Sequence, residues 1–187
     1  MSTLPEDAGP ILTKIARTAI AHKLGRNDAM EPHGEPWLFA PGAAFVTLTV
    51  GDAVLRGCVG SLQAHRPLVE DVQDNALAAA FRDTRFMPVE DDGFDDIHVE
   101  VSVLSAPEPI TFTSEDDALA QLRPGIDGVI FQAGSAQATF LPQVWEDISH
   151  PKEFMQHLRR KARVGYNYWG PDVKLWRYTV VSFHEDS

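Results

Sequence analysis

The chain has 187 residues and one cysteine, Cys58, and it lacks the motifs of several large enzyme classes. One cysteine cannot form an internal disulfide, so nothing points to a disulfide-rich secreted scaffold. There is no phosphate-binding glycine loop, paired-cysteine metal motif or nucleophile elbow, which argues against nucleotide hydrolases, iron–sulfur proteins and α/β-hydrolases. No run approaches the roughly 18 apolar residues of a membrane span. Residues 1–25 lack the basic start of a signal peptide, so we expect a cytoplasmic protein.

The composition is that of a folded, acidic protein. Hydrophobic residues make up 44% of the chain and charged residues 23%, which is typical of a globular domain. The net charge of −11 repels phosphates and anionic lipids, so neither nucleic acid nor a membrane is an expected partner. The length suits one domain spanning residues 1–187, to which an N-terminal helix (10–24) and a long loop (26–43) are appended.

Hydrophobic periodicity predicts an α+β fold in which one order of elements occurs twice. A hairpin, a helix and a strand follow one another over residues 44–104 and again over 128–183. A capping box formed by Ser114 and Asp117 predicts a short helix between the two copies. The predicted strands are 44–50, a second strand through Val59, 97–103, 128–132, 137–141 and 174–183, and the predicted longer helices run from Pro67 to about Asp83 and from Pro151 to about Arg163.

Cys58 is the first candidate for chemistry because Arg56 precedes it by two residues. Alternation along a strand puts both side chains on one face, where an arginine favours the reactive thiolate. His65 is a candidate base, and Gly57 and Gly60 leave room for a ligand or for a second backbone. In the alternative interpretation, Cys58 is a small buried residue, the glycines shape a bend and the arginine belongs to an ion pair.

Four arginines and no lysine occur between residues 56 and 85. Besides Arg56, the arginines Arg66, Arg82 and Arg85 are candidate binding residues, because guanidinium groups suit two-pronged contacts with carboxylate or phosphate. The alternative is that they pair with acidic neighbours within the chain. Those neighbours are Glu70, Asp71, Asp74 and Asp83.

Three further patterns favour structure over chemistry. His98 and Glu100, with Asp96 in line, share a strand face and are possible metal ligands, but such residues more often form the wet face of a strand. We therefore predict no metal site and assign no cofactor. The basic run from Arg159 to Arg163 suits a helix C-terminus. The aromatic residues between Tyr166 and Tyr178 suit a loop packed on the core, in preference to a base-stacking surface.

Seven segments, spread in order over nearly the whole chain, carry a family resemblance: 45–48, 55–60 (Leu-Arg-Gly-Cys-Val-Gly), 66–68, 79–86, 96–104, 141–144 and 175–178. In these segments the chain resembles the AMMECR domain family, the AmmeMemoRadiSam system protein A of bacteria and archaea. Two departures stand out, because related sequences often have a second cysteine near Arg159 and a glycine near Arg163. Without the second cysteine, a redox pair within the chain is not expected.

The resemblance implies a fold of duplicated β-α-β-β units and a place in a three-protein system. Family members are encoded beside, or fused to, a Memo-type protein and a radical S-adenosylmethionine (radical SAM) protein, which are therefore the expected partners. The resemblance thus suggests an accessory or a catalytic part in that system. Together with the residue pattern described above, the alternatives are an enzyme, or enzyme subunit, with a cleft around Cys58 and Arg56, and a non-catalytic module that binds one of those partners. The family implies no particular reaction, and the sequence leaves the oligomeric state open.

Overall fold

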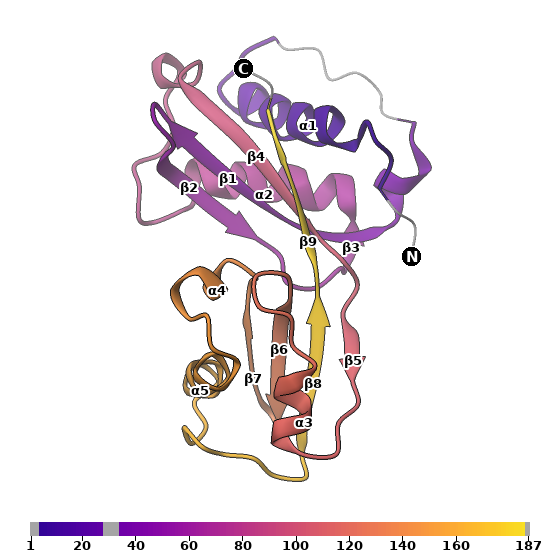
Figure 1. Ribbon diagram of the computed structural model, residues 1–187. Helices are drawn as coiled ribbons and strands as arrows, with labels where there is room; N and C mark the ends of the chain where they lie inside the picture. Colours follow the sequence, from indigo (N-terminus) through magenta and orange to yellow (C-terminus); the bar gives the residue numbers. More distant parts are fainter. Residues whose placement is uncertain (1–3, 28–33, 186–187) are drawn as a thin grey trace. The chain divides into compact units, whose positions relative to one another are not determined.

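The computed structural model describes residues 4–27 and 34–185, and the chain divides into two compact units (Figure 1). Unit 1 comprises Met1–Leu104 together with Val181–Ser187, and unit 2 comprises Ser105–Val180. The chain therefore passes from one unit to the other twice. The predicted organisation as a single domain over residues 1–187 stays a prediction.

Unit 1 contains a sheet with the strand order β2-β1-β4-β9, and the short strand β3 also pairs with β1. The hairpin β1–β2 and the pair β1–β4 are antiparallel. The elements of the unit are α1 (Ala8–Lys23), the 3₁₀ helix η1 (Pro36–Phe39), β1 (Pro41–Val50), β2 (Val54–Gly60), β3 (Arg66–Pro67), α2 (Leu68–Phe81), the 3₁₀ helix η2 (Asp91–Gly93), β4 (Ile97–Leu104) and β9 (Val180–His184).

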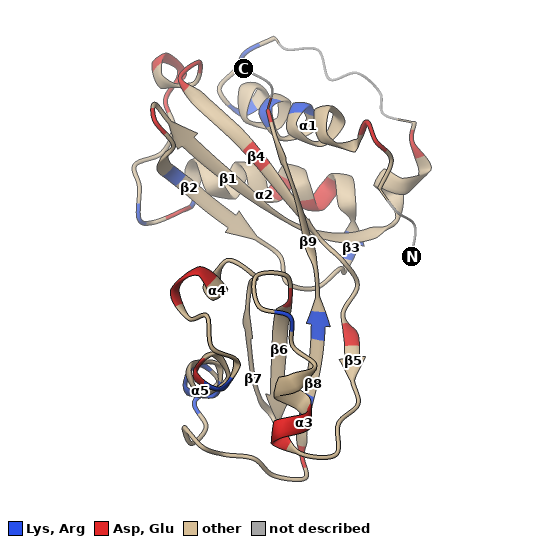
Figure 2. Cartoon of the chain, in the orientation of Figure 1, with Lys and Arg blue, Asp and Glu red and all other residues tan. Residues whose placement is uncertain are grey.

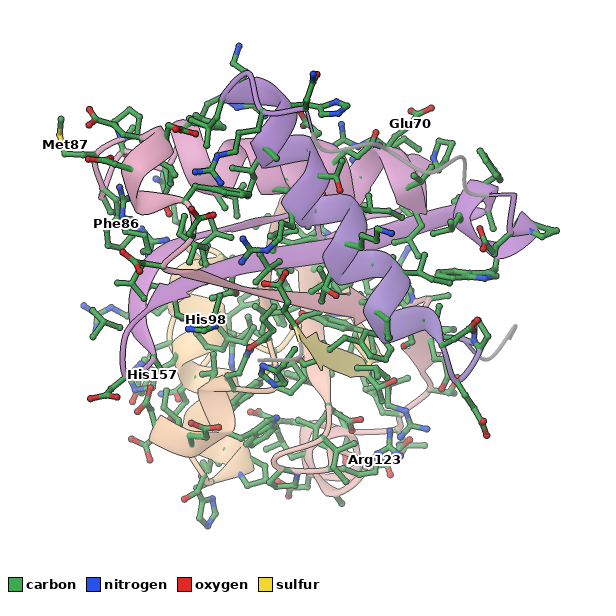
Figure 3. The ribbon with its side chains drawn as sticks, turned by 90° about the horizontal axis from the view of Figure 1, so that it is seen from above. Glu70, Phe86, Met87, His98, Arg123 and His157 are labelled. Atoms are coloured by element: carbon green, nitrogen blue, oxygen red, sulfur yellow. The ribbon has the colours of Figure 1, made fainter. Side chains whose placement is uncertain are left out.

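Both long helices of unit 1 pack on the same face of its sheet, as Figure 3 shows from above. Alternate residues of β1 and β4 point toward the helices and form the core with them. On β1 these are Ala44, Val46 and Leu48. The residues between them, such as Thr47, point the other way, onto what we call the helix-distal face of the sheet.

Unit 2 has its own sheet, in the order β5-β8-β6-β7, and its own core. In that core the rings of Trp145 and Phe154 stack with centroids 3.7 Å apart. The predicted cap is confirmed, because the Ser114 hydroxyl accepts from the Asp117 N–H at 3.1 Å. The elements are β5 (Glu108–Ile110), α3 (Glu115–Ala120), β6 (Gly128–Ala133), β7 (Ala136–Phe140), α4 (Val144–Asp147), α5 (Pro151–Lys161) and β8 (Val173–Tyr178).

The predicted α+β fold with a repeated hairpin, helix and strand is confirmed by the two sheet orders. In unit 1 the first hairpin strand lies between its partner and the strand after the helix, in the order β2-β1-β4. Unit 2 repeats this arrangement as β7-β6-β8. Each three-stranded motif gains one outer strand, which is β9 beside β4 and β5 beside β8.

Two predictions about element boundaries are wrong. Residues 174–183 form two strands, β8 and β9, because the chain leaves one sheet at Thr179 and joins the other. The loop predicted over 26–43 is shorter at its C-terminal end, since β1 begins at Pro41, where Gly42 pairs with Arg66 and Ala43 with Leu104. Residues 28–33 of that loop lie outside the described residues.

Candidate functional site

The hexamer Leu55–Gly60 lies on β2, at one end of the strand order of unit 1. Gly57 is buried against α2, and Cys58, the next residue, is half-buried. Because successive side chains of a strand point to opposite faces, the Cys58 side chain projects onto the helix-distal face. There Cys58 faces Thr47 of β1, whose hydroxyl donates to the Cys58 Sγ at 3.3 Å.

The backbone of Cys58 is held by Asp83 and Arg85, which follow α2. The Cys58 N–H donates to Asp83 Oδ2 at 3.0 Å, and Arg85 Nη2 donates to the Cys58 carbonyl at 3.2 Å. The two side chains also pair with each other, at 2.7 Å between Arg85 Nη2 and Asp83 Oδ2. The Arg85 guanidinium, followed by the Cys58 N–H, holds the pKa of Asp83 well below its ordinary value.

Arg56, the predicted partner of the thiol, is bound to backbone carbonyls. Its Nη1 donates to Met87 O at 2.6 Å and its Nη2 to Pro88 O at 3.3 Å. The pairing of β1 with β2 is irregular here, because Leu48 pairs with Gly57 while Thr49 pairs with Leu55, which leaves Arg56 between them. Among the described contacts of Arg56, none reaches the Cys58 sulfur.

His65, the predicted base, is exposed in the segment between β2 and β3. Across residues 4–27 and 34–185, no hydrogen bond or ion pair of its side chain is described. The structure therefore brings neither His65 nor Arg56 into described contact with the Cys58 thiol. A cleft built from these three residues stays a prediction.

The two glycines of the hexamer have their open sides filled by the protein itself. A Cβ at Gly57 would lie 2.2 Å from the carbonyl oxygen of Ala79 in α2. A Cβ at Gly60 would lie 2.2 Å from the Phe45 ring. Of the two uses that the sequence leaves open, room for a ligand or for a second backbone, the geometry at Gly57 favours the second.

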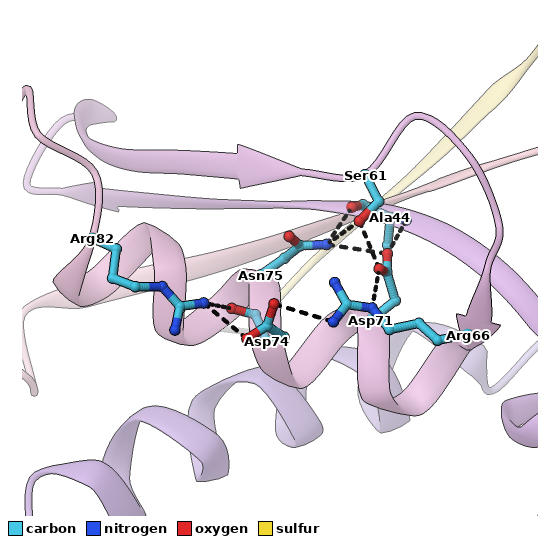
Figure 4. A network of polar contacts seen from close by, with 7 residues as sticks. All are labelled: Ala44, Ser61, Arg66, Asp71, Asp74, Asn75 and Arg82. Carbon is cyan, nitrogen blue, oxygen red and sulfur yellow. Dashed lines mark hydrogen bonds and ion pairs between the residues drawn. The ribbon is translucent and has the colours of Figure 1, made fainter.

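Arg66 and Arg82 pair with aspartates of α2, as the ion-pair alternative expects (Figure 4). Arg66 Nε lies 2.8 Å from Asp71 Oδ1, and Arg82 Nη2 lies 2.8 Å from Asp74 Oδ1. Together with the pair of Arg85 and Asp83, three of the four arginines thus have carboxylate partners within the chain.

The Asp71 carboxylate is fully buried and organises the polar network drawn in Figure 4. It accepts hydrogen bonds from the Ala44 N–H at 2.9 Å, from the Ser61 hydroxyl at 2.6 Å and from Arg66 Nε. Asn75 adds bonds to Asp71 and to the Ala44 carbonyl. The network joins α2 to β1 and to the residue that follows the hexamer, so its role is to hold the fold of unit 1.

Sequence reasoning missed a polar row on the helix-distal face, which links the neighbours of Cys58 across the sheet. Glu100 of β4 is the register partner of Thr47, and its Oε1 accepts from the Ser102 hydroxyl at 3.0 Å. Its Oε2 lies 3.4 Å from His184 Nδ1. The alternation of residues 97–103 already places Glu100 and Ser102 on one face, but no local signal shows that β9 lies beside them.

Among the residues that the structure describes, no third side chain joins His98 and Glu100 as a metal ligand. His98 is exposed, and the described partners of Glu100 are Ser102 and His184. Within the part of the chain that the structure describes, no group of three or more His, Cys, Asp and Glu side chains is placed to hold a metal ion.

The basic run of α5, visible as blue residues in Figure 2, is divided between the interior and the surface. Arg159 is buried, pairs with Glu115 and donates to the Tyr168 carbonyl at 3.0 Å. Arg163 lies just beyond the helix with φ of 62°. This left-handed conformation favours glycine, which is the residue that the family resemblance places near this position.

The fold and the site together define a class of α+β proteins. In this class a hairpin–helix–strand motif occurs twice. A hexamer on the second hairpin strand of the first copy contains two glycines, one packed against the helix and one against the neighbouring strand. The contacts that the structure describes around the hexamer join it to other parts of unit 1.

Comparison with known proteins identifies the family: residues 13–183 match the AMMECR1 family, and the chain belongs to it. A protein of Methanothermobacter thermautotrophicus is 37% identical over 98% of this chain and 97% of its own length. One from Thermococcus gammatolerans is 34% identical, covering 100% of this chain and 94% of its own. The crystal structure of the uncharacterized protein PH0010 from Pyrococcus horikoshii has a TM-score of 0.81 and 31% identity, covering 98% and 94% of the two chains. No described helix of the present chain is both long and apolar enough to cross a membrane.

Proposed function

We propose that the chain is a non-catalytic interaction module, which binds the Memo-like or the radical SAM protein expected from the family resemblance. One observation carries the proposal: the guanidinium groups of Arg56 and Arg85, which would serve a reactive site around Cys58, are bound within the protein. Arg56 holds the carbonyls of Met87 and Pro88, and Arg85 holds Asp83. With these guanidinium groups engaged, the hexamer acts as architecture.

The cytoplasm is the proposed compartment, because a chain with one cysteine gains nothing from an oxidising environment. The partner class rests on the family resemblance, and the family itself is shown by the match over residues 13–183. A module of this kind presents a rigid surface, and the buried Asp71 network supplies rigidity next to the hexamer.

Binding to purified partners tests the proposal. The chain is mixed with the Memo-like and the radical SAM protein of the same organism, and complex formation is followed by titration calorimetry and size-exclusion chromatography. We expect a complex with at least one of them, and Cys58→Ser retains its affinity within about twofold, since serine keeps the shape of the side chain and removes only the thiol chemistry. No complex with either protein at about 100 μM, a concentration at which weak transient pairs still associate, contradicts the proposal.

A second candidate function, a reactive thiol at Cys58, is favoured by one observation. The sulfur lies on the helix-distal face, accepts from Thr47 and is not enclosed in the core. The folded chain is treated with iodoacetamide near neutral pH, with an unfolded sample as reference. Alkylation faster than in the unfolded chain supports a reactive thiol, and an inert thiol in the folded state excludes it. The alkylation rate is compared with that of the matched variant Thr47→Val, which removes the hydrogen bond to the sulfur and keeps the shape of the side chain.

A further inference from the structure

β2 has an outer edge that a further strand can join. It stands at one end of the strand order of unit 1, so its hydrogen bonds to the sheet are made with β1 alone. In an antiparallel pair, every second residue of an edge strand turns its N–H and C=O outward. Cys58 is such a residue, since these two groups bond to Asp83 and Arg85 and not to β1.

The segment Asp83–Pro88 runs along this outer edge and is attached to it at two places. At Cys58 the attachment consists of the Asp83 carboxylate on the N–H and the Arg85 guanidinium on the carbonyl. Two residues earlier on β2, Arg56 reaches out to the carbonyls of Met87 and Pro88. The segment therefore takes the place of a neighbouring strand without forming one.

Three side chains around the edge are apolar and exposed. Val54 is 62% exposed, Leu55 40% and Met87 79%, and Met87 points away from the molecule in Figure 3. A strand edge flanked by exposed apolar side chains pairs readily with another strand. A second copy of the same chain fits it best, because two identical β2 edges run antiparallel about a two-fold axis and match each other's hydrogen-bonding groups.

We propose that the segment Asp83–Pro88 is a cover, which Asp83, Arg85 and Arg56 fasten to β2 and which prevents the chain from pairing with a second copy through that edge. The inference is independent of the proposed function, because it concerns self-association and not a partner. It gives Arg56 and Arg85 a shared task that the sequence does not reveal, namely closing the edge of the strand that carries Cys58.

The test removes the fastening at Cys58 with the double variant Asp83→Ala/Arg85→Ala. The control is Asp74→Ala/Arg82→Ala. It deletes a nearby exposed ion pair of the same charges, and this pair makes no described contact with β2. Hydrogen exchange reports on the Cys58 amide, and light scattering after size-exclusion chromatography reports the mass. We expect the first variant to form dimers or larger species, and its Cys58 amide to exchange at least about tenfold faster at a dilution where the chain is monomeric, while the control matches the unaltered chain in both measurements.

A third variant separates edge pairing from unfolding. Leu55→Lys, added to the first double variant, puts a charge at the uncovered edge and is expected to restore the mass of the unaltered chain. The proposal is overturned if the first variant keeps that mass. It is also overturned if the control associates equally, or if Leu55→Lys leaves the association unchanged, because the association then arises from general loss of structure.

Discussion

Replacing Gly57 with alanine tests whether the hexamer is architecture. The new Cβ would lie 2.2 Å from the carbonyl oxygen of Ala79. An ordinary contact begins at 3.4 Å, so β2 and α2 must separate by about 1.2 Å in a close-packed interior. Overpacking costs about 1–3 kcal/mol, and here the obstacle is helix backbone that cannot rotate away. We expect Gly57→Ala to lower the free energy of unfolding by about 3 kcal/mol, a large share of the roughly 5–15 kcal/mol of a typical protein.

Denaturant unfolding followed by circular dichroism measures this loss. Amide exchange in β2 and α2 assigns the loss to unit 1, because a chain of two units need not unfold in one step. Gly93→Ala is the control, since a Cβ there meets nothing within 4 Å, and its effect stays within about 0.5 kcal/mol. Gly60→Ala falls between them, because the Phe45 ring can turn aside. If Gly57→Ala unfolds at the same denaturant concentration as Gly93→Ala, contact with α2 is not the reason for the glycine.

Three further changes concern charge and backbone conformation. Arg163→Gly relieves a left-handed residue and should raise the free energy of unfolding by about 1 kcal/mol in denaturant titrations, whereas Arg160→Gly inside α5 should lower it by about as much. Asp71→Ala removes a buried carboxylate and leaves its donors, among them Arg66, without that partner, so we expect a loss of about 3–5 kcal/mol by the same measurement. The lowered pKa of Asp83 stabilises the folded chain above the ordinary aspartate pKa of about 3.9, and this contribution disappears as the pH falls through the folded-state value. Asp83→Asn should therefore weaken the dependence of the denaturation midpoint on pH below about 4.

Each of these changes has an outcome that contradicts its reasoning. Equal destabilisation by the two glycine substitutions at Arg160 and Arg163 would show that backbone strain at the end of α5 is negligible. A loss below about 1 kcal/mol for Asp71→Ala would show that water replaces the carboxylate. An unchanged pH profile in Asp83→Asn would show that Asp83 is not held by Arg85 in solution.

The sequence predicts local features of this chain well and long-range partners poorly. Alternation along residues 97–103 and the cap at Ser114 depend on near neighbours, and both appear in the structure. Residues 174–183 also follow a strand pattern, but a pattern with period two does not show that the strand changes sheets at Thr179.

The candidate site shows the same limit. The sequence offers pairing with aspartates as one of two alternatives for Arg66, Arg82 and Arg85. This alternative can be read from the sequence because the charges are separated by few residues along α2 and at its ends. Two contacts depend on how α2 and the segment after it pack against β2. They are the contact of Gly57 with Ala79 and the hydrogen bond from Arg56 to the Met87 carbonyl. The spacing of residues within the hexamer carries no information about this packing.

The double passage of the chain between the units has a consequence for synthesis on the ribosome. Unit 2 is continuous in sequence, so its last residue, Val180, is synthesised before residues 181–184 of unit 1. Unit 1 holds the earliest residues, yet its sheet lacks β9 until residues 181–184 have been added, and α1 gains its ion pair between Arg17 and Glu185 one residue later. Although domains made first generally fold first during translation, the unit that begins this chain is completed last.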